Sequence, residues 1–501
     1  MKNDNHNLKT QTLSLFVGKV LAFLVQIITP LILVRILTKT DFGVYQQFQL
    51  LAGMLLPILG LCLNTSLFYY YPIYDQEGRK AIIIQTYCML FLIGIIFVAV
   101  FLNFHGFILA KVNLLELDKY DYIISLYILF MLVSSITDFL FILEKKIKYN
   151  IFFYPTERLV RLVLILAFLY SNKNTWGCLM GLLVYAFIRF IFISLYIAKK
   201  YLSNIRHIWD KVRSGSVFDQ LKYSLPFVGG VVLETISKRF DKILINKYVD
   251  PSEYAIYAVA FFSIPLLTML FSSINNVVVP EMSRLAHAGS DSDVIEMWHK
   301  VVEKTSSAAI PCIVFFFIMA EEVIVILFTG QYAEAAVYYR IYLLTFIFTM
   351  TSFGLVLRSY KKTTLIFRAN LISTITTVAI GYFLISNFQM IGAITTAVIS
   401  IALPIIIVIY YEKKLLNLKI KNWLPWYTMA KITLIAILAG LIILPIKLFQ
   451  FNDITALFIT ALLYFPIIIF AEYRFNLFIY PEVISTYVVK INMRLQRIFA
   501  K

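Results

Sequence analysis

Long apolar runs separated by short polar connectors make up most of this sequence of 501 residues. A helix needs about 20 mostly apolar residues to cross a membrane, and the chain supplies that length repeatedly. The runs lack the period-two alternation of barrel strands, so we expect helices. The pattern predicts fourteen spans, at residues 12–36, 43–71, 80–102, 121–143, 150–170, 176–198, 222–246, 253–281, 303–328, 336–358, 364–386, 389–411, 426–447 and 451–471.

The composition supports a membrane protein. Hydrophobic residues make up 60% of the chain and charged residues only 15%, whereas a soluble domain carries about 25% charged residues. The four cysteines stand singly inside apolar stretches, without the spacing of a metal site or a disulfide framework. We therefore expect a single bundle of spans with neither cofactor nor metal.

Lysine and arginine are unevenly shared between the two sides of the predicted bundle. When the connectors are assigned alternately to opposite sides, the side that holds both termini carries 28 of the 45 basic residues. Cytoplasmic connectors keep the excess of positive charge, so we expect both termini in the cytoplasm. Contact with anionic headgroups explains the net charge of +17 without a nucleic acid partner. The opposite side carries seven basic residues: Arg35, Lys39, Lys111, Lys119, Lys173, Lys247 and Lys447.

A polar phrase in the first half of the chain returns in the second half. Asp41–Tyr45 (DFGVY) matches Glu253–Tyr257 (EYAIY) at an offset of 212 residues, and Asn64 then falls on Asn276. The first six spans are therefore predicted to repeat as the second six. Because each copy has an even number of spans, the copies insert the same way up, with a substrate path at their interface.

The repeat defines the predicted organisation. We expect an all-α polytopic membrane protein whose fourteen transmembrane helices form two pseudo-symmetric six-helix lobes and a C-terminal helix pair. The predicted parts are an N-terminal lobe (1–198), a basic cytoplasmic connector (199–221), a C-terminal lobe (222–411), the helix pair (412–471) and a basic cytoplasmic tail (472–501).

Three stretches resemble a known family. Pro30–Gln46 is similar to the first hairpin of bacterial polysaccharide-unit flippases of the multidrug/oligosaccharidyl-lipid/polysaccharide exporter superfamily. Ser224–Asp250 resembles their seventh span and Ile391–Ile399 their twelfth. The likeness covers nearly the whole chain but contains no catalytic signature. Glu321 and Glu322, near the end of the ninth span, depart from the family pattern.

This resemblance implies a transporter of the bacterial cytoplasmic (inner) membrane. It implies that an undecaprenyl-pyrophosphate-linked oligosaccharide, of the O-antigen or capsule type, is moved from the inner to the outer leaflet by alternating access. The expected partners are that lipid-linked oligosaccharide, membrane lipids and the polysaccharide polymerase machinery. Na⁺ or H⁺ is the expected coupling ion.

Basic residues inside the spans are the candidates for binding a pyrophosphate. A charge near the centre of a span costs roughly 2.5 to 3.5 kcal/mol, so such residues usually face a cavity or a partner. Guanidinium groups suit pyrophosphate because their planar fork offers paired donors. Snorkelling to the interface is the alternative for Lys19 and Arg189, and a structural ion-pair cluster is the alternative for Arg239. The candidates are Lys19, Arg158, Arg161, Arg189, Lys238 and Arg239.

Acidic residues inside the spans are the candidates for ion coupling. Asp138 lies on the fourth span, and Glu234 and Asp241 lie on the seventh. Burial disfavours an ionised carboxylate and makes proton exchange possible. Pairing with a neighbouring Arg or Lys is the alternative for each. Residues 234, 238 and 241 share one face of their helix.

Three other classes of membrane protein can be compared with this sequence. A membrane polymerase or glycosyltransferase would need a sizeable domain outside the membrane, and the longest outer connector, Asn103–Tyr120, is too short. The sequence therefore does not indicate an enzyme. A multidrug or cation antiporter of the same fold would favour an acidic cavity, whereas the charges in these spans are mostly basic. A flippase for a lipid-linked peptidoglycan precursor stays open.

The charge distribution generates a first testable prediction. In a cysteine-free background, a cysteine introduced at Lys145 should resist a membrane-impermeant thiol label in intact cells, whereas one at Lys39 or Lys247 should react. Because the positive connectors face the cytoplasm, lysis should expose the first site. Labelling at Lys145 from outside would overturn the orientation.

Overall fold

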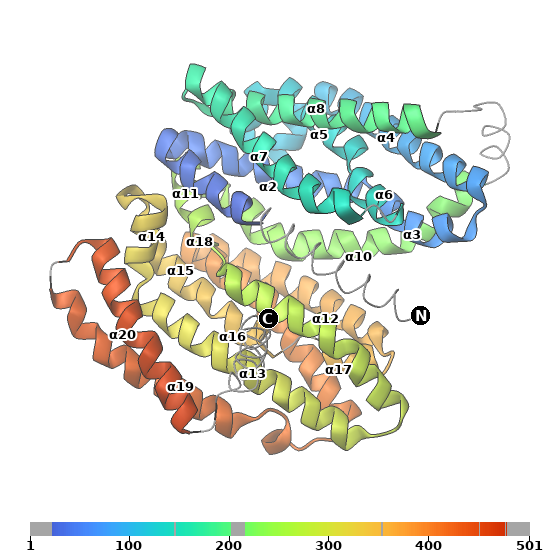
Figure 1. Ribbon diagram of the computed structural model, residues 1–501. Helices are drawn as coiled ribbons and strands as arrows, with labels where there is room; N and C mark the ends of the chain where they lie inside the picture. The colour runs from blue at the N-terminus through green and yellow to red at the C-terminus, as the bar shows by residue number, and fades with distance from the viewer. Residues whose placement is uncertain are drawn as a thin grey trace, which may run out of the picture. The chain divides into compact units, whose positions relative to one another are not determined.

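A computed structural model describes residues 23–144, 147–201, 216–351, 354–449, 451–475 and 477 (Figure 1). Every regular element within these ranges is a helix, as the apolar pattern predicts. Eight helical stretches in these ranges are long and apolar enough to cross a membrane. The long helices α7 and α10 are not among the eight, and both carry charged residues in the middle of their length.

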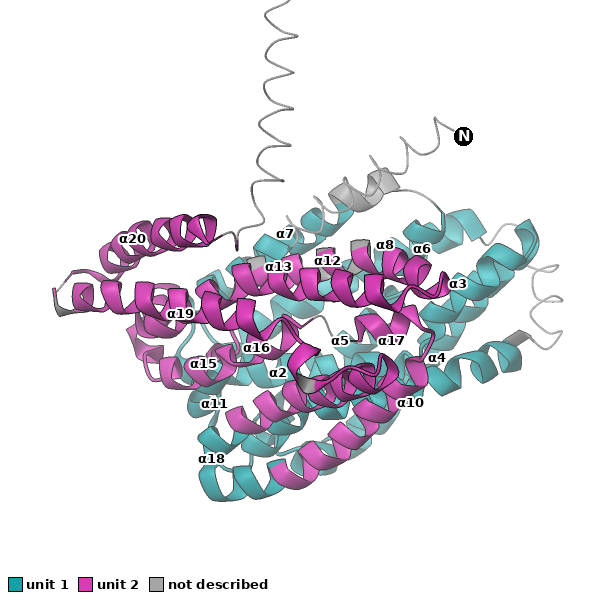
Figure 2. Cartoon of the chain, turned by 90° about the horizontal axis from the view of Figure 1, so that it is seen from below, with its two compact units in different colours: residues 1–258, 381–393 teal, residues 259–380, 394–501 magenta. Residues whose placement is uncertain are grey.

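The chain divides into two compact units (Figure 2). Unit 1 comprises Met1–Ala258 and Gly381–Ala393, and unit 2 comprises Val259–Ile380 and Ile394–Lys501. Each unit has its own hydrophobic core, around Leu63, Ile83 and Ile136 in unit 1 and around Met282 and Trp298 in unit 2.

Unit 1 holds the first half of the helices. Its elements are the stretch Phe23–Ile36, α2 (Lys39–Leu59), α3 (Leu63–Ile73), α4 (Gln76–Lys111), the 3₁₀ helix η1 (Leu115–Tyr120), α5 (Asp121–Ser134), α6 (Thr137–Leu143), α7 (Ile147–Ser171), α8 (Thr175–Tyr201), α10 (Ser216–Ile245) and α11 (Pro251–Val259).

Unit 2 holds most of the remaining helices. They are α12 (Pro265–His287), α13 (Asp291–Ile318), α14 (Ala320–Phe328), η2 (Gly330–Tyr332), α15 (Ala335–Leu343), α16 (Thr345–Thr349), α17 (Leu355–Ser359), α18 (Thr363–Leu415, whose middle belongs to unit 1), η3 (Ile420–Asn422), α19 (Trp426–Ile443), η4 (Leu444–Leu448) and α20 (Asp453–Arg474).

Helix breaks differ in places from the predicted span boundaries. The predicted span 43–71 is interrupted between α2 and α3, where Leu61 and Cys62 have positive φ angles of 45° and 52°. The predicted spans 364–386 and 389–411 correspond to the two arms of α18, between which the helix is broken at Gln389 (φ 44°, ψ −118°). The count of fourteen spans and the lobe boundaries stay predictions.

A buried polar network holds α10 against the other helices of unit 1. The Gln220 side-chain amide donates to the hydroxyls of Ser66 and Thr86, at 2.8 Å each. Its carbonyl oxygen accepts a hydrogen bond of 2.9 Å from Gln85. Buried polar groups stabilise a structure only when they are paired, and this network therefore specifies how α10 packs on α3 and α4.

The polar phrase that repeats in the sequence caps a helix in both places. The Thr38 hydroxyl accepts from the backbone N–H of Asp41 at the start of α2 (3.1 Å). Asp250 accepts from the backbone N–H of Glu253 at the start of α11 (2.9 Å), and Glu253 accepts in return from the N–H of Asp250. The hydrogen bond from Glu253 holds the pKa of the Asp250 carboxyl below its usual range. The second is a capping box and the first a simple N-cap, and they lie at the 212-residue offset of the repeat.

The start of α2 also contacts the start of α11. A Cβ atom at Gly43 would lie 1.7 Å from the carbonyl oxygen of Pro251, so no side chain has room at that position. One helical turn further on, the Gln47 amide donates to the side-chain oxygen of Asn246 (2.7 Å). The first hairpin is tied to α8 as well, because Asp41 accepts from the N–H of Thr175 (3.0 Å).

Candidate substrate-binding site

A polar cavity of about 180 Å³ lies in unit 1 between α7, α2 and the stretch Phe23–Ile36. Arg158 and Arg161 line it from α7, because residues three apart share one face of a helix. None of its eight lining residues is acidic. We call it the arginine cavity, and its lining residues are Gln26, Thr29, Pro30, Tyr45, Gln46, Gln49, Arg158 and Arg161.

The arginine cavity has unused hydrogen-bond donors. The Nε atom of Arg161 and the Nε2 atom of Gln49 are buried and have no hydrogen-bond partner among the described residues. The Arg161 guanidinium interacts with tyrosine hydroxyls around it, those of Tyr45 and Tyr127 among them. A buried donor without a partner loses its solvation without compensation. An anion in the cavity would supply that partner.

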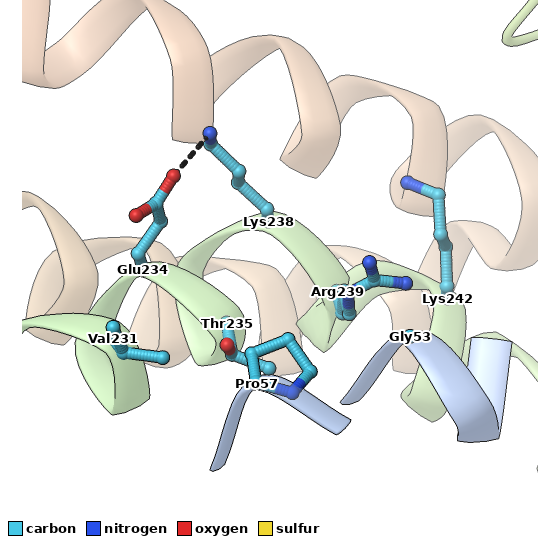
Figure 3. Close-up of a pocket in the computed structure, with 8 residues that line it drawn as sticks. All are labelled: Gly53, Pro57, Val231, Glu234, Thr235, Lys238, Arg239 and Lys242. Atoms are coloured by element: carbon cyan, nitrogen blue, oxygen red, sulfur yellow. Dashed lines mark hydrogen bonds and ion pairs between the residues drawn. The ribbon is translucent and has the colours of Figure 1, made fainter. Parts of the chain in front are cut away.

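A second cavity of about 450 Å³ lies along α10, again within unit 1 (Figure 3). Lys238 and Arg239 line it as predicted substrate-binding candidates, together with Glu234, Lys242 and Gly53. Lys238 donates to Glu234 four residues earlier, at 2.6 Å. Lys242 pairs with the buried Asp241 at 3.2 Å, and Asp241 also accepts from the Tyr257 hydroxyl. We call it the α10 cavity.

Arg239 is positioned in the α10 cavity by a glycine on the neighbouring helix. A Cβ atom at Gly53 would lie 2.6 Å from Nη1 and 2.8 Å from Cζ of Arg239. The guanidinium therefore rests against the backbone of α2, and Figure 3 shows it beside Gly53 and Pro57. No ion pair between Arg239 and a carboxylate is found within the described ranges. Its five N–H donors suit an anionic ligand.

Arg189 lies in a different environment. Its guanidinium contacts Asp138 on α6 and Glu157 on α7, each at 3.0 Å, and the Tyr185 hydroxyl donates to Glu157. The Arg189 and Glu157 side chains are both only 8% exposed. We call these four residues the Arg189 cluster. With two carboxylates around one guanidinium, it carries one excess negative charge when both acids are ionised.

Close packing of α7 on α8 brings the arginine cavity and the Arg189 cluster next to each other, with Tyr185 interacting with both Arg161 and Arg189. A Cβ atom at Gly181 of α8 would lie 2.6 Å from Cα of Ile165 of α7, so the glycine permits the contact. Glu157 then points to Arg189 on α8, while Arg158 and Arg161 line the cavity beside α2.

The remaining residues singled out in the sequence lie outside the described residues or in unit 2. Lys19, most of the predicted basic connector and nearly all of the predicted tail lie outside the described residues. Glu322, which departs from the family pattern, pairs with Lys447 at 2.8 Å in unit 2. One cavity between the lobes that takes all the candidate cations stays a prediction.

Several polar residues of these sites were not among the sequence candidates. Gln46 and Gln49 lie one turn apart on α2, and Gln26 lies in the preceding helix. Three amides within apolar spans are a usable signal, because an unpaired amide in hydrocarbon is costly. Gly53 gives no such signal, since glycine is common in membrane helices.

The fold is similar to that of membrane transporters of known structure. Among solved structures, the chain is similar to one described as lipid II flippase MurJ in an inward closed conformation. The TM-score is 0.66 and the identity 15%, over 94% of this chain and 100% of that one. A multidrug resistance MATE family transporter of the MOP superfamily, in an inward-facing conformation, matches with a TM-score of 0.58 and 12% identity, over 80% of this chain and 98% of that one. The protein has the fold of the MOP superfamily, that of multidrug, oligosaccharidyl-lipid and polysaccharide exporters.

The family follows from the sequence match. Residues 8–286, more than half of the chain, match the family described as polysaccharide biosynthesis protein, and the chain belongs to it. No curated protein matches the sequence. A MOP superfamily transporter from Pyrococcus furiosus shares the fold, with a TM-score of 0.52 and 13% identity, over 81% of this chain and 94% of that one. The protein is thus a multi-pass membrane protein of the polysaccharide biosynthesis family with a fold that transporters share.

The contact between Arg239 and Gly53 generates a second prediction. Gly53→Ala should displace the Arg239 guanidinium towards the α10 cavity and lower the midpoint of thermal unfolding of the detergent-solubilised protein by less than a clash in a closed core would, because the clash falls on the end of a flexible side chain. Adding Arg239→Ala should recover most of that loss, since the shortened side chain leaves room. Gly230→Ala is the matched control, because nothing lies within 4 Å of its Cβ position. A double variant as unstable as Gly53→Ala alone would contradict the contact.

The Arg189 cluster generates a third prediction. Arg189→Ala should destabilise the protein by roughly 3 to 5 kcal/mol, because two carboxylates lose their buried partner. Arg161→Ala should destabilise it less, because no carboxylate lines the arginine cavity. Thermal unfolding compares the two variants. Adding Asp138→Asn and Glu157→Gln to Arg189→Ala should restore stability, and failure to do so would argue against a structural ion-pair role for Arg189.

Proposed function

We propose that this protein is a flippase for an undecaprenyl-pyrophosphate-linked oligosaccharide, which it moves from the inner to the outer leaflet of the bacterial cytoplasmic membrane. The observation that carries the proposal is the arginine cavity. It combines two arginines with amide and hydroxyl groups, and none of its lining residues is acidic. Membership of the polysaccharide biosynthesis family supports a lipid-linked oligosaccharide as the substrate class.

The chemistry of the headgroup explains why such a cavity is needed. A pyrophosphate can leave water only where donors replace its hydration. Arginine is suited to this role because its planar fork forms paired, charge-assisted hydrogen bonds to phosphate oxygens. Arg158 and Arg161 are proposed to bind the pyrophosphate in unit 1. Arg239 and Lys238 in the α10 cavity are proposed to bind it at another stage of the same passage.

Transport is proposed to proceed by alternating access between two six-helix lobes, with fourteen spans and both termini cytoplasmic. The helix N-caps at Thr38 and Asp250, which recur at the repeat offset, support a duplicated architecture. The distribution of Lys and Arg supports the orientation.

Coupling to Na⁺ or H⁺ is proposed to use the Arg189 cluster. Arg189 and Glu157 are almost fully buried, whereas the Asp138 side chain is 42% exposed and gives a cation or proton access to the cluster. Binding of one cation or one proton would neutralise the excess negative charge of the cluster. Asp138, a predicted coupling residue, would share this role with Glu157. Glu234 stays a second candidate, and its pair with Lys238 lies on an exposed part of α10.

Two alternatives use the same fold. A flippase for a lipid-linked peptidoglycan precursor is favoured by the similar structure that is described as a lipid II flippase. It would use the arginines in the same way, since its substrate also carries a pyrophosphate. A multidrug cation antiporter is disfavoured, because two arginines and no acid would repel a cation.

The arginine cavity generates the fourth prediction. Arg158→Ala/Arg161→Ala should reduce export of the glycan at least tenfold while the protein still accumulates in the membrane, because about 1.4 kcal/mol of lost binding already gives that factor. Arg→Lys at both positions should restore export only in part if forked contacts to phosphate matter. Surface polysaccharide and accumulated lipid-linked intermediate are measured together.

The control is Arg284→Ala, which removes an exposed arginine that pairs with Glu281 in unit 2. Such a surface pair contributes little, so export should be unchanged. Normal export by the double alanine variant would overturn the role proposed for the arginine cavity. If the intermediate that accumulates carries a peptidoglycan precursor, the alternative substrate is correct.

A further inference from the structure

Unit 2 contains a cavity of about 330 Å³ that differs chemically from both cavities of unit 1. It lies between α12, α15, α16 and α18, and none of its seven lining residues is charged. Four of them carry a hydroxyl group and three carry an aromatic ring. We call it the threonine cavity, and its lining residues are Thr268, Phe271, Tyr342, Thr345, Phe346, Thr349 and Ile401.

The three threonines that line this cavity use their hydroxyl protons within the protein. The single proton of Thr345 is donated to the carbonyl of Tyr342 (2.7 Å), that of Thr349 to Phe346 (3.2 Å), and that of Thr268 to the first turn of α12 (2.9 Å). A hydroxyl has one donor and two acceptor lone pairs. Once its proton is used, the group can only accept. The threonines therefore suit a ligand that donates hydrogen bonds.

The aromatic side chains supply flat apolar surface next to these acceptors. Tyr342 and Phe346 lie one turn apart with ring centroids 6.0 Å apart and nearly perpendicular planes. Phe261 packs on the far side of Tyr342 with a centroid separation of 5.0 Å, which fixes the tyrosine ring. The face of an aromatic ring carries partial negative charge and attracts weakly positive C–H groups. A ligand with both hydroxyl donors and a C–H face matches this lining.

The helix that lines the threonine cavity keeps helical dihedrals at Leu344, between α15 and α16 (φ −60°, ψ −22°), and is interrupted further on, before α17. The predicted span 336–358 is divided into α15, α16 and α17, and Gly354 before α17 has a φ of +70°. Interrupted helices within a membrane are tolerated where they line a cavity. In transporters, such discontinuous helices commonly form substrate sites.

We propose that the threonine cavity binds a sugar residue of the transported glycolipid. This inference rests on the proposed function and adds a second contact region, for the saccharide, to the one for the pyrophosphate. A pyranose ring presents hydroxyl donors at its edge and C–H groups on its face. Thr345, Thr349 and Thr268 accept from the hydroxyl groups, and the rings of Phe271, Tyr342 and Phe346 pack on the C–H face.

Other occupants match the lining less well. The pyrophosphate would meet three acceptors and no charged donor, so it would lose its hydration without replacement. The isoprenoid chain would leave three hydroxyl groups in contact with hydrocarbon. A drug-like cation would find no acidic residue among the seven that line the cavity.

The test compares two probes on the purified protein, undecaprenyl pyrophosphate and the sugar-bearing intermediate extracted from cells depleted of this protein. Native mass spectrometry measures the affinity for each. The wild type should bind the sugar-bearing lipid more tightly. Thr345→Val/Thr349→Val should reduce that affinity about three- to tenfold, because two hydrogen bonds are lost, and leave binding of the sugar-free lipid unchanged.

Matched variants separate binding from folding. Thr374→Val removes a buried hydroxyl with the same type of hydrogen bond to its own helix, away from the cavity, and should leave both affinities unchanged. Thr345→Ser/Thr349→Ser keeps the hydroxyl groups and should bind like the wild type. If the valine variant does not fold, the serine variant and Tyr342→Ala carry the comparison, with Tyr342→Ala expected to weaken only the sugar-bearing probe.

The outcomes distinguish the two proposals. If the wild type binds both lipids equally, or if the valine variant keeps full affinity for the sugar-bearing lipid, the sugar site is overturned and the flippase proposal stands. If the valine and alanine variants weaken both probes equally, the cavity holds the isoprenoid chain and the sugar site is again overturned. If the wild type binds neither probe, the proposed function itself fails.

Discussion

The cost of keeping a charge inside a membrane governs this structure. A buried guanidinium must find a carboxylate, a set of neutral acceptors or a ligand. Arg189 has two carboxylates, whereas Arg161 has tyrosine hydroxyls as neighbours; the Nε atom of each lacks a hydrogen-bond partner among the described residues. The two side chains lie on facing helices, yet only one is neutralised by the protein. Arg189 therefore belongs to an ion-pair cluster, which we propose takes part in coupling. Arg161 belongs to a cavity that we propose binds an anion.

The three cavities differ in the hydrogen-bonding groups that they offer to a ligand. The arginine cavity and the α10 cavity in unit 1 offer N–H donors, and the threonine cavity in unit 2 offers acceptors and aromatic faces. A lipid-linked oligosaccharide has an anionic centre and a saccharide that donates hydrogen bonds. Each part of the proposed substrate therefore has a matching surface, and neither surface would serve for the other part.

The apolar runs of the sequence predict the helical architecture. The sequence also identifies most of the charged residues proposed to bind substrate, because a charge within a long apolar run is easily recognised. It also predicts contacts within a helix, such as Lys238 with Glu234, since residues four apart share a face. It cannot predict which acids meet Arg189, because Asp138 and Glu157 come from two other helices. Gly53 and Gly181 permit close contacts because they lack a side chain, and a hydropathy pattern does not reveal such contacts.

The contact of Arg239 with Gly53 has a consequence for the history of this family. The space that receives the guanidinium exists only while position 53 lacks a side chain. A relative that acquires alanine or a larger residue there must shorten or reorient the side chain at position 239, and the two positions should therefore change together. Among homologous chains, the residue at 53 would then report whether the cation at 239 is retained, although the first lies on an apolar helix and carries no chemistry of its own.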